Sequence, residues 1–107
     1  MTYAEFWLRY LRAHGRPATR GLHYFGSLLV LAVLIAAAAS GSWYWLVAAP
    51  FIGYGCAWAA HFLLEGNRPE TFGHPLWSLV SDYRMLLLWL AGRLDPHLDR
   101  AGVRTRS

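Results

Sequence analysis

Apolar residues recur at helical spacing over the first 14 residues of the chain, with polar residues on the opposite side. The apolar side of this repeat comprises Tyr3, Phe6, Trp7, Tyr10, Leu11 and His14. Thr2 and Glu5 have the spacing of a capping box, and Gly15 and Pro17 are typical of a helix end. We predict an amphipathic helix that lies at a membrane interface; the alternative is an ordinary soluble helix packed on a partner.

A long apolar block follows, from Leu22 to about Ser40, and it contains no charged residue. Its length is close to the ~20 residues that a helix needs to cross a bilayer. A cleaved signal peptide is the alternative, because the small residues before Gly41 resemble a processing site. The stretch before the apolar block is long for a signal peptide, which favours a membrane span.

A second apolar block runs from an aromatic group, Trp43-Tyr44-Trp45, to about Leu64. Such aromatic groups are typical of membrane–water interfaces, and the preceding Ser40-Gly41-Ser42 predicts a tight turn. Gly53 and Ala57 have the spacing of small residues at which membrane helices approach closely. The two blocks together predict a transmembrane helical hairpin.

A third apolar segment, from Leu76 to about Leu90, has a more polar face formed by Ser78, Ser81, Asp82 and Met85. Asp82 is a functional candidate because ionisable residues are costly within membrane segments. Two placements stay open: a third span, or an interfacial or re-entrant helix, which the positive-inside tendency favours. We predict an all-α fold, with one membrane-embedded helical domain over residues 1–92 and a basic, flexible tail over 93–107.

Composition supports the membrane interpretation. The 107-residue chain is 56% hydrophobic and 15% charged, which is too apolar for a soluble domain of this size. All ten basic residues are arginine, as in GC-rich bacterial genomes, and most lie near the two chain ends. Basic ends beside apolar segments fit anionic lipid headgroups rather than nucleic acid. We expect a multi-pass protein of a bacterial inner membrane with its N-terminal side in the cytoplasm, and a homo-oligomer stays open.

The hairpin would bring distant histidines to one level. His23 lies roughly 17 residues before the predicted turn, and His61 lies about as far after it. At ~1.5 Å per residue, antiparallel helices place both about 26 Å from the turn. His14 precedes the first span and His74 follows the second, so both lie on that side. Four histidines are thus predicted to converge on one membrane face, whereas His97 belongs to the tail.

Several imidazoles in one place indicate a metal site, since histidine binds iron, zinc and copper. Three or four histidines, with or without Glu65 at the helical spacing i+4 from His61, would hold a non-haem iron with open positions. The alternative is structural zinc in a non-catalytic membrane protein that binds headgroups or a partner helix. We predict that Glu65 and Asp82 orient imidazole N–H groups, or that one of them is a direct ligand.

A metal at headgroup depth would meet the polar end of an acyl chain whose tail remains in the bilayer. Arg16, Arg20 and Arg68 are candidates to bind a carboxylate through a two-pronged contact. Arg68 is the best placed of them, next to Asn67 in the loop between His61 and His74. We therefore take Asn67 and Arg68 as candidate substrate-binding residues.

Three motifs carry a resemblance to a known family. They are Phe6-Trp7-x-x-Tyr10-Leu11-x-x-His14, Leu22-His23-x-x-Gly26 and Ala57-Trp58-x-x-His61-Phe62-x-x-Glu65-x-Asn67-x-Pro69-x-Thr71-Phe72-x-His74-Pro75. Over roughly residues 5–90 the chain resembles small membrane proteins related to the yeast 2-hydroxy fatty acid dioxygenase of the endoplasmic reticulum, and is most similar to their short bacterial branch. Arg16 departs from the pattern, since family members often have an asparagine there.

The resemblance implies an Fe(II)-dependent dioxygenase that shortens a 2-hydroxy fatty acid by one carbon, a step of fatty acid α-oxidation. Dioxygen is then the second substrate. The motif histidines His14, His23, His61 and His74 are the iron ligands that the resemblance implies. The short branch lacks segments of the yeast protein, so the acyl chain length stays open.

Overall fold

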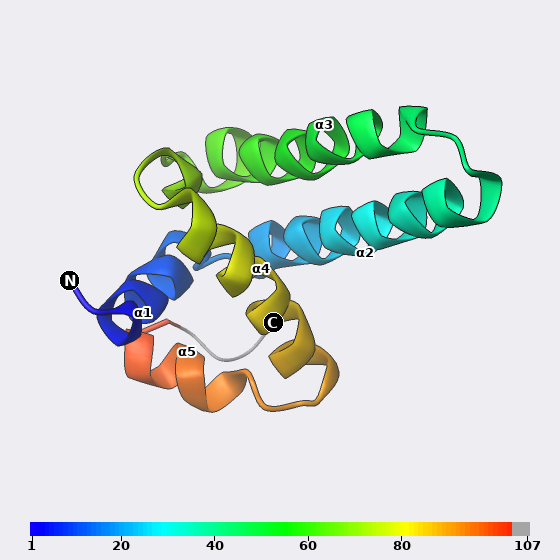
Figure 1. Cartoon of the computed structure of the whole chain (residues 1–107). Helices are drawn as coiled ribbons and strands as arrows, with labels where there is room; N and C mark the ends of the chain where they lie inside the picture. Colours follow the sequence, from blue (N-terminus) through cyan, green and yellow to red (C-terminus); the bar gives the residue numbers. More distant parts are fainter. Residues whose placement is uncertain (104–107) are drawn as a thin grey trace.

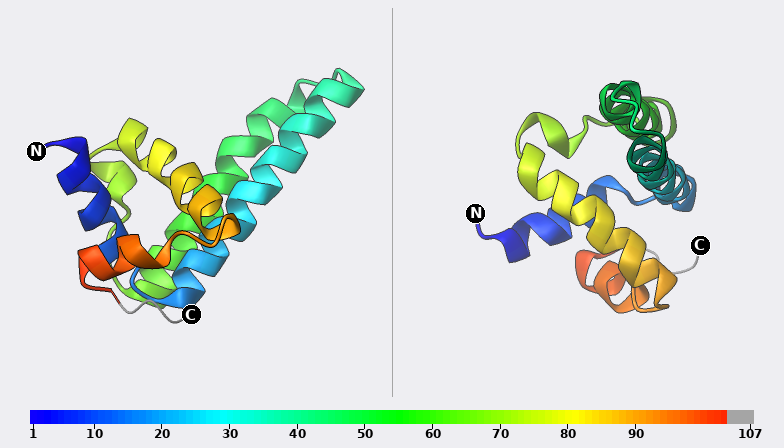
Figure 2. Two further views of the ribbon diagram at one scale, coloured as in Figure 1. Left: turned by 90° about the horizontal axis from the view of Figure 1, so that it is seen from below. Right: turned by 45° about the vertical axis from the view of Figure 1, so that its right-hand side comes forward.

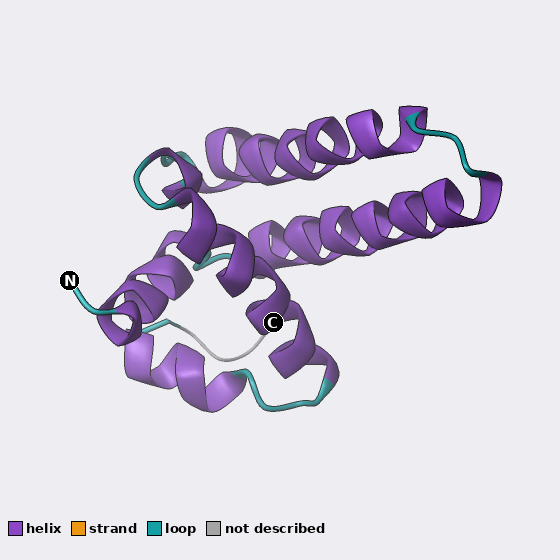
Figure 3. Cartoon of the chain, in the orientation of Figure 1, coloured by secondary structure: helices purple, strands orange, loops and turns teal. Residues whose placement is uncertain are grey.

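A computed structural model describes residues 1–103, and within that range helices joined by short loops make up the chain, with no strand (Figures 1 and 3). This confirms the predicted fold class. The elements in order are α1 (Tyr3–Ala13), α2 (Pro17–Ser40), α3 (Tyr44–Ala59), the π-helix η1 (Ala60–Glu65), the 3₁₀-helix η2 (Glu70–Phe72), α4 (Pro75–Leu90) and α5 (Asp95–Ala101).

Helix α1 is capped as predicted. The Thr2 hydroxyl accepts a hydrogen bond from the Glu5 backbone N–H, and the Glu5 carboxylate accepts one from the Thr2 N–H. The apolar face, however, is buried against α4 and α5. Phe6 and Leu11 are fully buried within the protein, so this face is not available to a bilayer. The prediction of an interfacial helix is therefore replaced by its alternative, a helix packed on other elements, and these belong to its own chain.

Helices α2 and α3 form the predicted hairpin, which projects beyond the rest of the molecule (Figure 2). Gly41 makes the turn in a left-handed conformation with φ of 69°. The helices approach closely at Gly26, where an added Cβ would lie 2.7 Å from the Cβ of Cys56. The segments Pro17–Ser40 and Tyr44–Glu65 are each long and apolar enough to cross a membrane. Many of their large apolar side chains are exposed, as a surrounding bilayer requires.

Helix α4 leads the chain back towards its beginning. It starts near the base of the hairpin, where α3 ends, and its other end continues through Gly92 into α5 (Figure 1). Leu98 of α5 is buried in the cluster that contains the apolar face of α1. Because α5 contacts α1, both ends of α4 lie on the N-terminal side of the hairpin. Of the two placements left open for α4, this arrangement fits the non-spanning one.

The C-terminal segment differs from the flexible tail predicted over 93–107. Asp95–Ala101 form a helix that contacts α1, with Leu94 and Leu98 buried. The Trp7 indole N–H donates to Nδ1 of His97 at 3.0 Å, which ties the segment to α1. Residues 104–107 lie outside the described part of the chain.

Candidate metal centre

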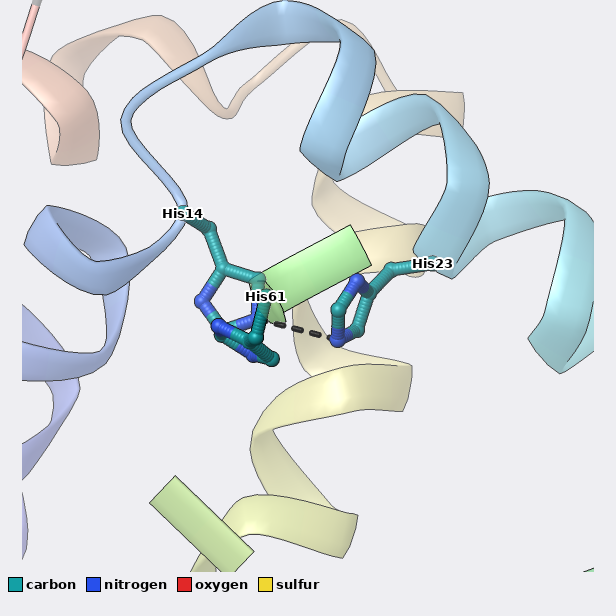
Figure 4. A group of neighbouring side chains, drawn as sticks. All are labelled: His14, His23 and His61. Atoms are coloured by element: carbon teal, nitrogen blue, oxygen red, sulfur yellow. Dashed lines mark hydrogen bonds between the residues drawn. The ribbon is translucent and has the colours of Figure 1, made fainter. Parts of the chain in front are cut away.

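Three histidines from three separate elements meet in the interior (Figure 4). His14 follows the last residue of α1, His23 lies in the second turn of α2, and His61 lies in the π-helix η1. All three are buried, and their candidate ligand nitrogens lie within 4.8 Å of one another. The predicted common level of His23 and His61 is thus observed, with ring centroids 5.1 Å apart. Short π-helical segments are frequent at functional sites, and η1 is such a segment.

The outer nitrogen of each ring is held by an oxygen acceptor. His14 Nδ1–H donates to the Tyr10 carbonyl at 2.7 Å, and His23 Nδ1–H donates to the Thr19 carbonyl at 3.1 Å. His61 Nδ1 lies 2.8 Å from Oδ1 of Asn67. The Asn67 amide orientation follows from its other end, where Nδ2 donates to the Ala13 carbonyl at 3.0 Å. Each Nδ1 therefore carries the ring proton.

This tautomer leaves a lone pair on Nε2 of all three rings. The Nε2 atoms of His14 and His23 lie only 3.0 Å apart, the contact drawn dashed in Figure 4. Two lone pairs at this distance repel unless a proton or a metal ion lies between them. Burial, followed by the charges of the other two histidines, holds the pKa of His14 well below its usual value, which disfavours the proton.

A metal ion satisfies the same geometry. Two nitrogen ligands bonded at about 2.1 Å and at a right angle to each other lie about 3.0 Å apart. Hydrogen bonds from metal-bound histidines to carbonyl or carboxamide oxygens are the usual outer support of such sites. The donor set therefore fits a divalent transition-metal ion held by His14, His23 and His61.

His74, the fourth predicted ligand, lies outside this group. It precedes α4 and packs between aromatic rings, with centroids 5.2 Å from both Phe6 and Trp77. The structure thus brings together three of the four predicted histidines. His97 also lies apart, as predicted, in its contact with Trp7.

Glu65 takes a different position from the one predicted for it. Its carboxylate accepts hydrogen bonds from the Arg16 backbone N–H and from the Thr19 hydroxyl, the latter at 2.9 Å. The residue preceding Pro17 provides no side-chain cap of its own to α2, so Glu65 supplies one from η1. This carboxylate joins the end of the second candidate span to the start of the first, and it forms no hydrogen bond with the described histidines.

The two loop residues predicted to bind substrate, Asn67 and Arg68, have other contacts in the structure. Asn67, a candidate for substrate binding, is the side chain that orients His61 and joins it to the end of α1. Arg68 is exposed, with its guanidinium 5.3 Å from the centre of the Phe72 ring. The arginine next to the metal centre is Arg20. It is 2% exposed, and its Nη1 donates to the carbonyls of His14 at 2.8 Å and Gly15 at 3.0 Å.

Asp82 is connected to the histidines through one intervening residue, Tyr10. It accepts a hydrogen bond from the Tyr10 hydroxyl, and the Tyr10 ring stacks on His14 with centroids 4.1 Å apart. Burial raises the pKa of Asp82 to about 7, although the Tyr10 hydrogen bond opposes the rise.

A cavity of about 230 Å³ adjoins the site between α2, α3 and α4. Its polar groups are His23, Ser27, Tyr54, Asp82 and Tyr83. Apolar residues of the hairpin and Leu79 of α4 form the remainder of its wall. The sequence contained no pattern for this cavity, since it depends on how α4 crosses the hairpin.

The fold and the site define a small all-helical protein with a buried three-histidine centre and a candidate membrane hairpin. Its residues 1–94 match the family model described as 2-hydroxy-palmitic acid dioxygenase Mpo1-like. The chain belongs to this family, which confirms the resemblance found in the sequence. No curated protein and no solved structure matches the chain significantly.

Proposed function

We propose that this protein is an Fe(II)-dependent dioxygenase that shortens 2-hydroxy fatty acids by one carbon at a membrane surface. The observation that carries the proposal is the convergence of three Nε2 lone pairs, each fixed by a hydrogen bond at the opposite ring nitrogen. The family description supports the substrate class, since it names a 2-hydroxy fatty acid and a dioxygenase.

The number of histidines favours an open catalytic site over a closed structural one. Structural zinc sites are almost always four-coordinate, and no fourth histidine, cysteine or carboxylate joins the group among residues 1–103. Three nitrogen ligands leave positions for substrate and dioxygen on an iron ion. The overall reaction balances, because R–CH(OH)–COOH and O₂ give R–COOH, CO₂ and H₂O. Bound iron would supply the redox chemistry with dioxygen that breaking the C1–C2 bond requires.

The chain's own residues perform the remaining tasks. His14, His23 and His61 hold the ion, and Asn67 keeps His61 in the correct tautomer. Asp82 lies on the wall of the cavity that includes His23, where it would accept the proton of the substrate hydroxyl. The hairpin would fix this site at the depth of the headgroups, within reach of an acyl chain in the bilayer.

Reconstitution tests the proposal. Purified protein, loaded anaerobically with Fe(II), should bind one iron per chain and consume oxygen with 2-hydroxypalmitate, releasing pentadecanoate and CO₂. Palmitate, which lacks the hydroxyl, is the matched control and should not be consumed. Protein that retains zinc and shows no turnover after iron loading would contradict the proposal and support the structural role.

A further inference from the structure

We propose that the cavity between α2, α3 and α4 is the binding site for the substrate's acyl chain, with the carboxylate end at His23 and the chain directed along the hairpin towards Val30 and Ala49. This inference rests on the proposed function, which supplies the 2-hydroxy fatty acid. It adds the position and direction of the ligand and the residues that select its length.

The cavity is more polar towards the histidines. His23 and Ser27 of α2 belong to that part, and the Tyr83 hydroxyl, next to Asp82 in the sequence, donates to the Ser27 carbonyl. Val30, Ala49 and Pro50 lie farther along the hairpin towards its turn, and Tyr54 also belongs to the wall. A ligand that complements both ends has a polar head and an apolar tail, as a fatty acid does. His23 belongs to the metal centre as well as to the cavity wall, so the head would lie beside the ion.

The direction follows from the antiparallel helices. From His23 to Val30, helix α2 advances seven residues, which is about 10 Å. Helix α3 accompanies it in the opposite sense, from Ala57 near the histidines to Ala49 near the turn. The α3 wall combines the small residues Ala49, Gly53 and Ala57 with Pro50 and Tyr54.

The volume of the cavity indicates that it encloses only part of a long acyl chain. At about 230 Å³ the cavity is smaller than the roughly 300–1,000 Å³ of most small-molecule sites. It would therefore enclose the carbons near the head and release the tail of a long chain into the surrounding lipid. Val30 and Ala49, at the end of the enclosed part, are then the residues that set how many carbons make contact.

Photo-crosslinking locates the chain without requiring turnover. A palmitate analogue with a diazirine at mid-chain should label cavity residues such as Ser27 and Ala57 in metal-free protein, and excess 2-hydroxypalmitate should reduce this labelling. Labelling confined to Leu29 and Phe51, exposed on the same two helices, would overturn the acyl site. If the cavity is labelled but the iron-loaded protein shows no turnover, the proposed function fails and the binding site stands.

Two opposite substitutions test length selection. Ala49→Leu should shift preference to shorter chains and Val30→Ala to longer ones, by about fourfold for each methylene that loses or gains contact. Val47→Leu is the control on the exposed side of α3 and should leave the preference unchanged. Bound iron, measured in every variant, establishes that the fold is retained. Equal shifts in all three variants, or no shift in the cavity pair, would contradict the assignment.

Discussion

His61 and Asn67 are joined by a 2.8 Å hydrogen bond between Nδ1 and Oδ1, and the same Asn67 side chain donates to the carbonyl of Ala13. One carboxamide therefore links His61, near the start of η1, to the residue before His14. It fixes the tautomer of one histidine and the position of another.

Replacing Asn67 by alanine should weaken iron binding by about 10- to 100-fold, as the loss of such outer supports usually does. Asn67→Asp keeps an oxygen for His61 but loses the N–H for Ala13, and should have a smaller effect. Competition with a chelator measures both affinities. Affinity unchanged in Asn67→Ala would remove this residue from the site.

Arg20 should contribute to the stability of the fold, and Arg16 should not. Its guanidinium is buried on the carbonyls of His14 and Gly15, whereas the Arg16 side chain is exposed. Arg20→Gln should lower the free energy of unfolding by about 1.5–3 kcal/mol, the contribution of hydrogen bonds from a charged group. Arg16→Gln removes the same charge and should change stability by less than about 0.5 kcal/mol. Denaturant titration in detergent compares them, and equal losses would indicate a general charge effect.

The close approach of α2 and α3 provides a steric test. Gly26→Ala places a methyl group 2.7 Å from the Cβ of Cys56, and overpacking of this kind costs about 1–3 kcal/mol. Gly55→Ala has open space and should instead stabilise the helix by up to about 1 kcal/mol. Thermal unfolding of both variants measures the difference. A Gly26→Ala protein as stable as Gly55→Ala would mean that the hairpin packs differently.

Asp82 predicts a pH dependence with a definite sign. Its folded-state pKa of about 7 lies above the usual value of 3.8 for this carboxyl group, so the folded protein holds this proton more tightly than the unfolded chain. Its contribution to stability is therefore full below about pH 4 and is lost as the pH rises through 7. Asp82→Asn keeps an acceptor for Tyr10 and should gain stability relative to the native protein between pH 5 and 8. A difference that is constant over this range would contradict the assignment.

The sequence could predict the hairpin and the pairing of His23 with His61, because helical rise is constant and a residue count gives depth. It could not predict the environment of α1. An amphipathic helix such as α1 can lie at a membrane interface or pack on other helices, and its pattern is the same in both cases. Its partner α5 contributes few apolar residues, Leu98 among them.

The sequence did not predict the partners of the Glu65 carboxylate. The spacing from His61 suggested a carboxylate beside the imidazole, but Glu65 instead accepts hydrogen bonds from the Arg16 backbone N–H and the Thr19 hydroxyl. The missing N-terminal cap of α2, where Arg16 precedes Pro17, was the available signal that another element must supply one. Asn67 gave no comparable signal, because its two contacts depend on tertiary packing alone.

The most direct test of the three-histidine centre is the iron content of single alanine variants, measured by elemental analysis after anaerobic loading and desalting. His14→Ala, His23→Ala and His61→Ala should each lose the bound ion, whereas His74→Ala and His97→Ala should retain one iron per chain. Iron retained by His61→Ala, or lost equally from all five variants, would contradict the account.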